Sequence, residues 1–138
     1  MAISINDFLA ENVDSKPETR EVKFPRFKSP FVIQSVTAEQ NETFQRNATR
    51  KVRDKLTRQI TTELDQNKYV DMLVTASVIT PDLNNEQLQK SWNSLADPAG
   101  VLKKMLRAGE YGDLTNEIQD LSGFDAEDVN QLSDEVKN

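Results

Sequence analysis

The 138-residue chain contains no cysteine and no histidine. Without cysteine it cannot form disulfides or thiolate metal sites, and without histidine it lacks the commonest general base and metal ligand. Its four glycines are scattered, so there is no glycine-rich loop of the kind that binds phosphate. No apolar run approaches the roughly 20 residues of a membrane span, and no signal peptide is recognisable. We therefore predict no catalytic residue, cofactor or metal site, and expect a cytosolic protein that is not an enzyme.

The composition favours a small binding domain. Acidic residues outnumber basic ones by 23 to 17, which gives a formal charge of −6 and argues against bulk nucleic-acid binding and against anionic membranes. Hydrophobic residues make up 36% of the chain, which is low for a globular protein. We expect residues 1–138 to form a single domain that has a modest core or completes its burial against a partner.

The N-terminal third predicts a short helix followed by two strands. Ser4 and Asp7 have the spacing of a helix cap, and the apolar residues after Ser4 lie roughly on one side: Ile5, Phe8, Leu9 and Val13. Residues 21–24 and 31–36 are rich in Val, Ile and Phe, and the proline-bounded segment 25–30 can turn the chain between them. Because an isolated hairpin is marginal in water, we expect it to pack on helices, pair with more strands or join a partner's sheet.

The middle of the chain predicts two helices. Thr37 and Gln40 have the spacing of a capping box. After them, apolar residues recur every four positions and predict a long helix with a break near Thr61 and Thr62: Phe44, Ala48, Val52, Leu56, Ile60 and Leu64. Residues 69–78 are apolar around much of a helical circumference, so we expect this second helix to be the most buried.

The segment from Pro81 to Phe124 predicts three short helices. Asn84 or Asn85 caps the first, and Asp97 with Pro98 begins the second. The second presents Val101, Leu102, Met105 and Leu106 on one face, and Gly109 is expected to end it in the left-handed conformation. The third carries Tyr111, Leu114, Ile118 and Leu121 and ends at Gly123. The fold class is therefore mostly α (α+β), a multi-helix domain with a small N-terminal β-hairpin packed on the helices. We expect residues 125–138 to form an acidic C-terminal helix or a mobile tail.

Two charged segments are candidate interaction surfaces. Six basic residues between positions 46 and 58 could form a phosphate-contacting helix, but on a helix they spread around the circumference, which favours a solvated or internally paired surface: Arg46, Arg50, Lys51, Arg53, Lys55 and Arg58. Residues 110–138 hold nine acids against Lys137. They could dock on the basic helix of the same chain or of a neighbouring subunit, contact a basic partner, or remain solvated.

The remaining candidate sites have simpler structural interpretations. The carboxylates Asp125, Glu127 and Asp128, and the calcium-loop-like Asp82, Asn84 and Glu86, are better explained as helix caps. Trp92, Tyr111 and Phe124 could anchor a partner, but burial in the chain's own core is the more common fate at such spacings.

Four stretches together resemble one protein family. They are SINDFLAENV at 4–13, RFKSPFVIQSVTAEQNE at 26–42, PDLNNEQLQ at 81–89 and DPAGVLKKMLRAGEYGDLTNEIQDLSGFD at 97–125. Their order and spacing resemble the tail assembly chaperones of phages and prophages of Gram-positive bacteria. Ala108 departs from the family pattern, in which proline often stands before the Gly-Glu-Tyr sequence.

This resemblance implies a non-catalytic chaperone that binds the tape measure protein, the major tail (tube) protein, or both, and keeps them soluble during tail morphogenesis. It implies a location in the host bacterial cytoplasm and absence from the mature virion. A homo-oligomer is compatible with these features, whereas membranes and nucleic acid are not expected partners. The alternatives are a structural or adaptor component of the phage particle and, third, a small nucleic-acid-binding regulator.

Overall fold

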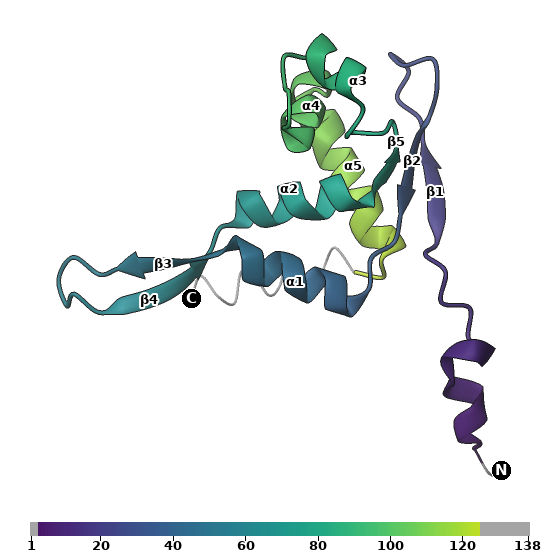
Figure 1. Cartoon of the computed structure of the whole chain (residues 1–138), viewed down its shortest axis with the longest axis horizontal. Coiled ribbons are helices and arrows are strands. Elements are labelled where there is room, and N and C mark those ends of the chain that lie inside the picture. Colours follow the sequence, from purple (N-terminus) through teal and green to yellow (C-terminus); the bar gives the residue numbers. More distant parts are fainter. Residues whose placement is uncertain (1–2, 125–138) are drawn as a thin grey trace.

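A computed structural model describes residues 3–124 as a helical body with two projecting segments (Figure 1). The fold is α+β, as predicted, and within the described range no helix is long and apolar enough to cross a membrane. The chain begins with the 3-10 turns η1 (Ile5–Phe8) and η2 (Ala10–Asn12). The other elements follow in the order β1 (Thr19–Val22), β2 (Phe31–Gln34), α1 (Ala38–Ala48), β3 (Thr49–Arg53), β4 (Ile60–Leu64), α2 (Gln66–Ser77), β5 (Val78–Thr80), α3 (Glu86–Ser91), α4 (Pro98–Met105) and α5 (Ala108–Leu121).

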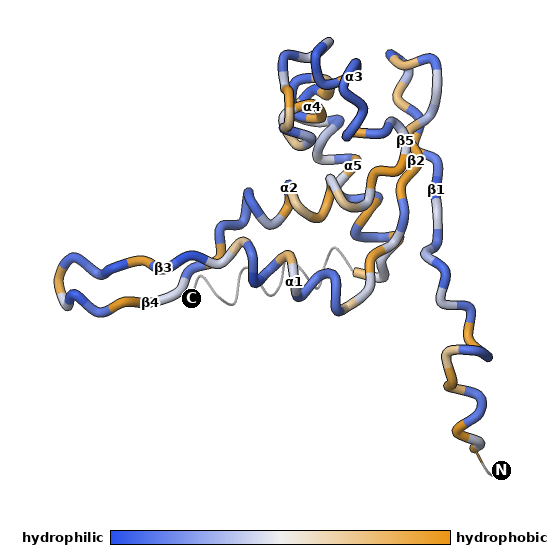
Figure 2. Tube along the Cα trace, in the orientation of Figure 1, coloured by the Kyte–Doolittle hydropathy of each residue, from blue (hydrophilic) through white to orange (hydrophobic). Residues whose placement is uncertain are grey.

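Strands β1, β2 and β5 form a three-stranded antiparallel sheet in the order β1-β2-β5, which contacts helices α2 and α5. Its central strand β2 and the edge strand β5 are more apolar than the edge strand β1 (Figure 2). Thr19 pairs with Gln34 and Val22 with Phe31, so the first strand begins two residues earlier than the sequence predicts. Phe31 and Ile33 of β2 are buried, as the two-residue period of a strand requires. The third strand, β5, follows α2 directly and was not predicted, because its three residues continue the apolar pattern of the helix.

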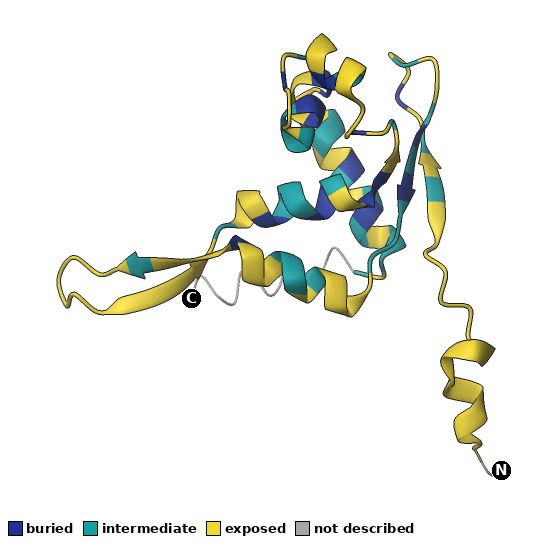
Figure 3. Ribbon diagram, viewed as in Figure 1, coloured by how far each residue is buried: buried dark blue, intermediate teal, exposed yellow. Residues whose placement is uncertain are grey.

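Helix α2 is the centre of the core, as predicted (Figure 3). It packs against α1, α4, α5 and β5, and its Leu73 and Val74 are completely buried. The Ser77 hydroxyl is also buried and donates to the Leu73 carbonyl at 2.8 Å, which satisfies its polar atom. The core is completed by Phe24, Phe31, Ile33, Ala48, Tyr69, Val78, Leu83, Val101, Leu102, Met105, Leu106, Leu114 and Ile118.

The predicted helix caps are largely confirmed. Thr37 and Gln40 form the reciprocal capping box of α1, with N–H to side-chain oxygen distances of 3.2 and 2.9 Å. Asn85 caps α3, and Asp97, followed by Pro98 at the first helical position, caps α4. Gly123 adopts a φ of 88° after α5, and the next residue, Phe124, donates its N–H to the carbonyl of Gln119 at 2.8 Å. This is the hydrogen-bond pattern of a Schellman end.

The prediction of a long helix through residues 49–64 is wrong. Helix α1 ends at Ala48, and strands β3 and β4 form a separate antiparallel hairpin that projects from the body (Figure 1). A spacing of four residues fits a strand as well as a helix, because four is a multiple of the strand period. The β-branched side chains of Thr49, Val52 and residues 60–62 then favour the strand. At the base of the hairpin, the Asp65 N–H donates to the Ala48 carbonyl at 2.9 Å.

Two further local predictions are corrected. The first segment forms two short 3-10 turns rather than one helix, and its apolar side chains are exposed because no part of the body covers them. Gly109 does not end α4 but lies in the first turn of α5. Helix α5 begins early because the Arg107 N–H donates to the Glu110 carboxylate at 2.8 Å, which stabilises the new N-terminus. The helix or tail predicted for 125–138 lies outside the described residues.

Two glycines of the α5 region should respond in opposite ways to substitution by alanine. At Gly112, inside α5, an added Cβ meets nothing within 4 Å, so Gly112→Ala should raise the free energy of unfolding by about 0.5–1 kcal/mol. At Gly123, the positive φ disfavours a Cβ, so Gly123→Ala should lower it by about 1 kcal/mol. Urea denaturation of both variants measures the difference. A loss of stability in Gly112→Ala would contradict the open surroundings described for this residue.

Candidate protein-binding surfaces

The first candidate surface is an apolar groove between the β1–β2 connection and helix α3. It has a volume of about 370 Å³, and its walls are mostly apolar. The aromatic rings of Phe24, Phe27 and Phe31 stack edge to face at centroid distances of 5.3 to 6.5 Å and support one wall. The residues that line the groove include Phe27, Pro30, Phe31, Leu88, Trp92 and Met105.

The sequence allowed Trp92 to be either a partner anchor or a core residue, and the structure gives it features of both. It forms the C-cap of α3 and is half-buried, so it packs on the core and also lines the apolar groove. A half-buried indole beside an apolar hollow is typical of the aromatic anchors that contribute most to protein–protein binding. Among the three predicted aromatic anchors, Trp92 is therefore the one best placed to contact a partner.

Tyr111 instead holds three helices together. Its hydroxyl donates to Asp71 Oδ1 at 2.7 Å, and Lys103 Nζ donates to Asp71 Oδ2 at 2.5 Å. Asp71 on α2 is thus joined to α4 and to α5. Burial raises the pKa of Tyr111, and the neighbouring Asp71 carboxylate raises it further, so the phenol stays protonated and remains a donor.

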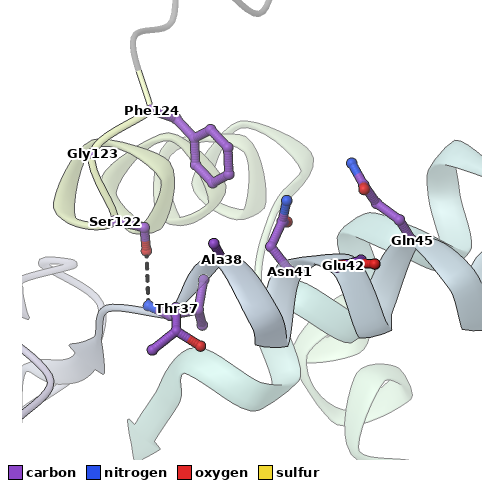
Figure 4. Close-up of a pocket in the computed structure, with 9 residues that line it drawn as sticks. Thr37, Ala38, Asn41, Glu42, Gln45, Ser122, Gly123 and Phe124 are labelled. Atoms are coloured by element: carbon purple, nitrogen blue, oxygen red, sulfur yellow. Dashed lines mark hydrogen bonds between the residues drawn. The ribbon is translucent and has the colours of Figure 1, made fainter.

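Phe124 lies beside a second, more polar groove between α1 and the end of α5 (Figure 4). The groove has a volume of about 470 Å³, and the α1 side contributes Asn41, Glu42 and Gln45. Ser122 closes one end, where its hydroxyl accepts the Val36 N–H at 3.1 Å. Because polar side chains form most of this wall, the groove is less suited to apolar partners than the groove at Trp92.

The acidic residues of α5 pair with two arginines that the sequence analysis missed. Arg20 on β1 donates to Glu117 and Asp120 at 2.8 and 2.9 Å. Arg26, in the β1–β2 connection, pairs with Glu110 and also donates to the Met105 carbonyl at 3.0 Å. These pairs fix the first strand and its loop on α5. The paired residues are 84 to 100 positions apart in the sequence, so no local sequence pattern predicts that they pair. Asp113 forms no ion pair with a described residue, and the acids from Asp125 onward lie outside the described range.

The basic run belongs mainly to the projecting hairpin rather than to a helix. Arg46 on α1 pairs with Glu42 at 3.5 Å, and Arg50 on β3 pairs with Glu63 on β4 at 3.7 Å. Within residues 3–124, no carboxylate forms an ion pair with the other four members: Lys51, Arg53, Lys55 and Arg58. The hairpin therefore presents a solvated basic surface.

The calcium-loop-like residues serve local structure. The Asp82 carboxylate accepts the Asn84 N–H at 3.0 Å, and the Asn85 amide oxygen accepts the Leu88 N–H at 3.0 Å. Over the part of the chain that the structure describes, no group of three or more acidic side chains could hold a metal ion. The carboxylates Asp125, Glu127 and Asp128 lie outside that part.

Comparison with known structures shows that this fold has been seen before. The crystal structure of the protein YqbN, a structural genomics target, matches with a TM-score of 0.71 over 91% of this chain and 100% of that chain. The sequences are 20% identical, so this likeness establishes the fold alone. No curated protein matches the chain.

The family is established by sequence. The profile of the phage XkdN-like tail assembly chaperone proteins matches residues 5–137. The chain therefore belongs to this family of phage tail assembly chaperones, which confirms the resemblance seen in the sequence.

The Arg26–Glu110 pair predicts a defined pH dependence of stability. The Arg26 guanidinium and the Arg107 N–H hold the pKa of Glu110 below its usual value, so the pair stabilises the fold above the unfolded pKa, about 4.3. This contribution is lost as the pH falls through that value toward the lower folded pKa. Glu110→Gln should therefore have a lower free energy of unfolding than the wild type at neutral pH. The difference between the two proteins should become smaller as the pH falls below about 4.

Urea denaturation at several pH values measures this difference. Glu18→Gln is the matched control, because it removes an exposed carboxylate that forms no ion pair with any described residue. An unchanged gap between Glu110→Gln and the wild type at all pH values would show that the ion pair does not control the acid response.

Proposed function

We propose that this protein binds the tape measure protein, the major tail (tube) protein, or both, and keeps them soluble until the tail assembles. It acts in the host bacterial cytoplasm and is absent from the finished virion. The observation that carries this proposal is membership of the tail assembly chaperone family across residues 5–137. The role is one of binding rather than catalysis, in keeping with a chaperone family.

The mechanism is reversible masking of apolar surface. A long helical client exposes apolar faces that would otherwise associate with one another. The chaperone covers these faces and shifts the client toward its soluble form by mass action. Tube subunits then bury the same faces more completely and displace the chaperone.

The apolar groove beside Trp92 is the proposed client-binding surface. Its aromatic and aliphatic walls can receive an apolar side chain from one face of a client helix, as in other helix-in-groove complexes. The rings of Phe24, Phe27 and Phe31 keep one wall rigid, so little conformational entropy is lost when a client binds.

The alternative is a structural or adaptor component of the phage particle. Such a component remains in the purified virion in stoichiometric amounts, whereas a chaperone does not. Quantitative mass spectrometry of purified particles from the same phage distinguishes the two roles.

Co-expression with the tape measure protein of the same genome tests the proposed function. We expect the wild-type chain to keep that protein soluble and to co-purify with it. Trp92→Ala and Leu88→Gln, which remove apolar groove walls, should each lower the soluble fraction by about threefold or more.

The matched control is Leu95→Ala, because Leu95 is 59% exposed in the loop after α3 and does not line the groove. Thermal unfolding of each variant separates lost binding from lost folding. Folded groove variants that support the client as well as the wild type would remove the groove from the proposal. A client that precipitates with the wild-type chain and with any longer product of the same gene would refute the chaperone role itself.

A further inference from the structure

Most of the large hydrophobic side chains that are exposed in the described structure lie on two projections from the body. The first is the N-terminal segment, residues 3–18, in which every residue is exposed (Figure 3). The second is the arm, residues 49–64, formed by β3, β4 and their turn. Of the ten large hydrophobic side chains that are exposed in the described structure, eight belong to these two projections: Ile3, Ile5, Phe8, Leu9 and Val13 in the first, and Leu56, Ile60 and Leu64 in the second.

The two projections carry opposite charge. The N-terminal segment has four acidic residues and one lysine, which gives a formal charge of −3: Asp7, Glu11, Asp14, Glu18 and Lys16. The arm has five basic and two acidic residues, which gives +3: Arg50, Lys51, Arg53, Lys55, Arg58, Asp54 and Glu63. Opposite charges around apolar side chains are the pattern of complementary halves of one interface.

The strand register of the arm concentrates this pattern on one face. Arg53 lies opposite Ile60, and Thr49 lies opposite Leu64. Because side chains alternate between the two faces of a strand, these four residues share one face of the arm with Lys51. The other face carries Arg50 and Glu63, which already pair with each other. The face with Lys51 and Arg53 thus combines two exposed aliphatic side chains with two cations that no described carboxylate neutralises.

The two projections of one molecule lie apart in the structure. They extend from different ends of the body, with the arm beyond α1 and α2 and the N-terminal segment beyond β1 (Figure 1). We propose that the arm of one copy of this protein packs on the N-terminal segment of a second copy. The aliphatic side chains of the arm contact Ile5, Phe8 and Leu9 of the other copy, and Asp7 and Glu11 face the basic residues at the rim.

This contact joins two different surfaces, and each copy carries one of each. Two copies can therefore exchange both contacts in a closed dimer, or successive copies can repeat the contact in a longer assembly. In both cases association depends on concentration and weakens with salt, because exposed charges are screened. It uses a different surface from the groove beside Trp92, which is the proposed site of client binding.

Charge exchange between the two projections tests the proposal in the full-length protein. Sedimentation velocity over a range of concentrations gives the concentration at which half of the chains are associated. Asp7→Lys/Glu11→Lys makes both projections basic, and Lys51→Glu/Arg53→Glu makes both projections acidic. Each double variant should raise the half-association concentration by about tenfold or more.

Rescue is the decisive part of the experiment. An equimolar mixture of the two double variants should associate again, and the quadruple variant that carries both changes should associate by itself. The control Glu39→Lys/Asp113→Lys alters net charge by the same amount at exposed sites outside both projections, and it should not weaken association as Asp7→Lys/Glu11→Lys does.

Three outcomes would overturn the proposal. The wild type could remain monomeric at all concentrations tested, or the mixture and the quadruple variant could fail to associate. Alternatively, reversing the arm charges could abolish association while Asp7→Lys/Glu11→Lys leaves it unchanged. The last result would assign the arm to a different partner, such as the acidic residues after Phe124. Client solubility in co-expression is a separate measurement, so loss of self-association and loss of chaperone function remain distinguishable.

Discussion

The burial of helix α2 is the constraint on which the rest of the structure depends. Leu73 and Val74 are completely buried, so neighbours must cover this helix from several directions. Helices α1, α4 and α5 and strand β5 supply that cover, and they use much of the apolar content of a chain that is only 36% hydrophobic. Apolar burial is the main favourable term in folding. The packing of these elements around α2 therefore supplies most of the free energy that stabilises the helical body.

Ion pairs then attach the sheet to this helical body. Arg20 and Arg26 reach Glu117, Asp120 and Glu110 along α5, and they hold β1 and its loop in place. Neither the N-terminal segment nor the arm receives such attachments from the described body, and both keep apolar side chains in solvent. A small body with exposed, charged and apolar projections is in keeping with the interactions with tail proteins that the chaperone family implies.

Most helix ends were predictable because their signals lie within a few residues. The capping box at Thr37, the caps at Asn85 and Asp97 and the Schellman end at Gly123 each depend on hydrogen bonds between residues at most five apart. The apolar face of α4 was also correct, since its period matches the helix. The arm was mistaken for a helix because a four-residue apolar spacing satisfies both periods, and Gly109 was misplaced because the Arg107–Glu110 contact starts α5 early.

The sequence by itself determined the helical character of the body, its buried central helix, most of its caps and the family to which it belongs, because each of these is written in short-range patterns and their order. Tertiary structure alone decided the pairing of β2 with β5, the partners of Arg20 and Arg26, the groove beside Trp92 and the separation of the two projections. These features join residues that are far apart in the chain, and no local pattern records which distant segments will meet when the core closes around α2.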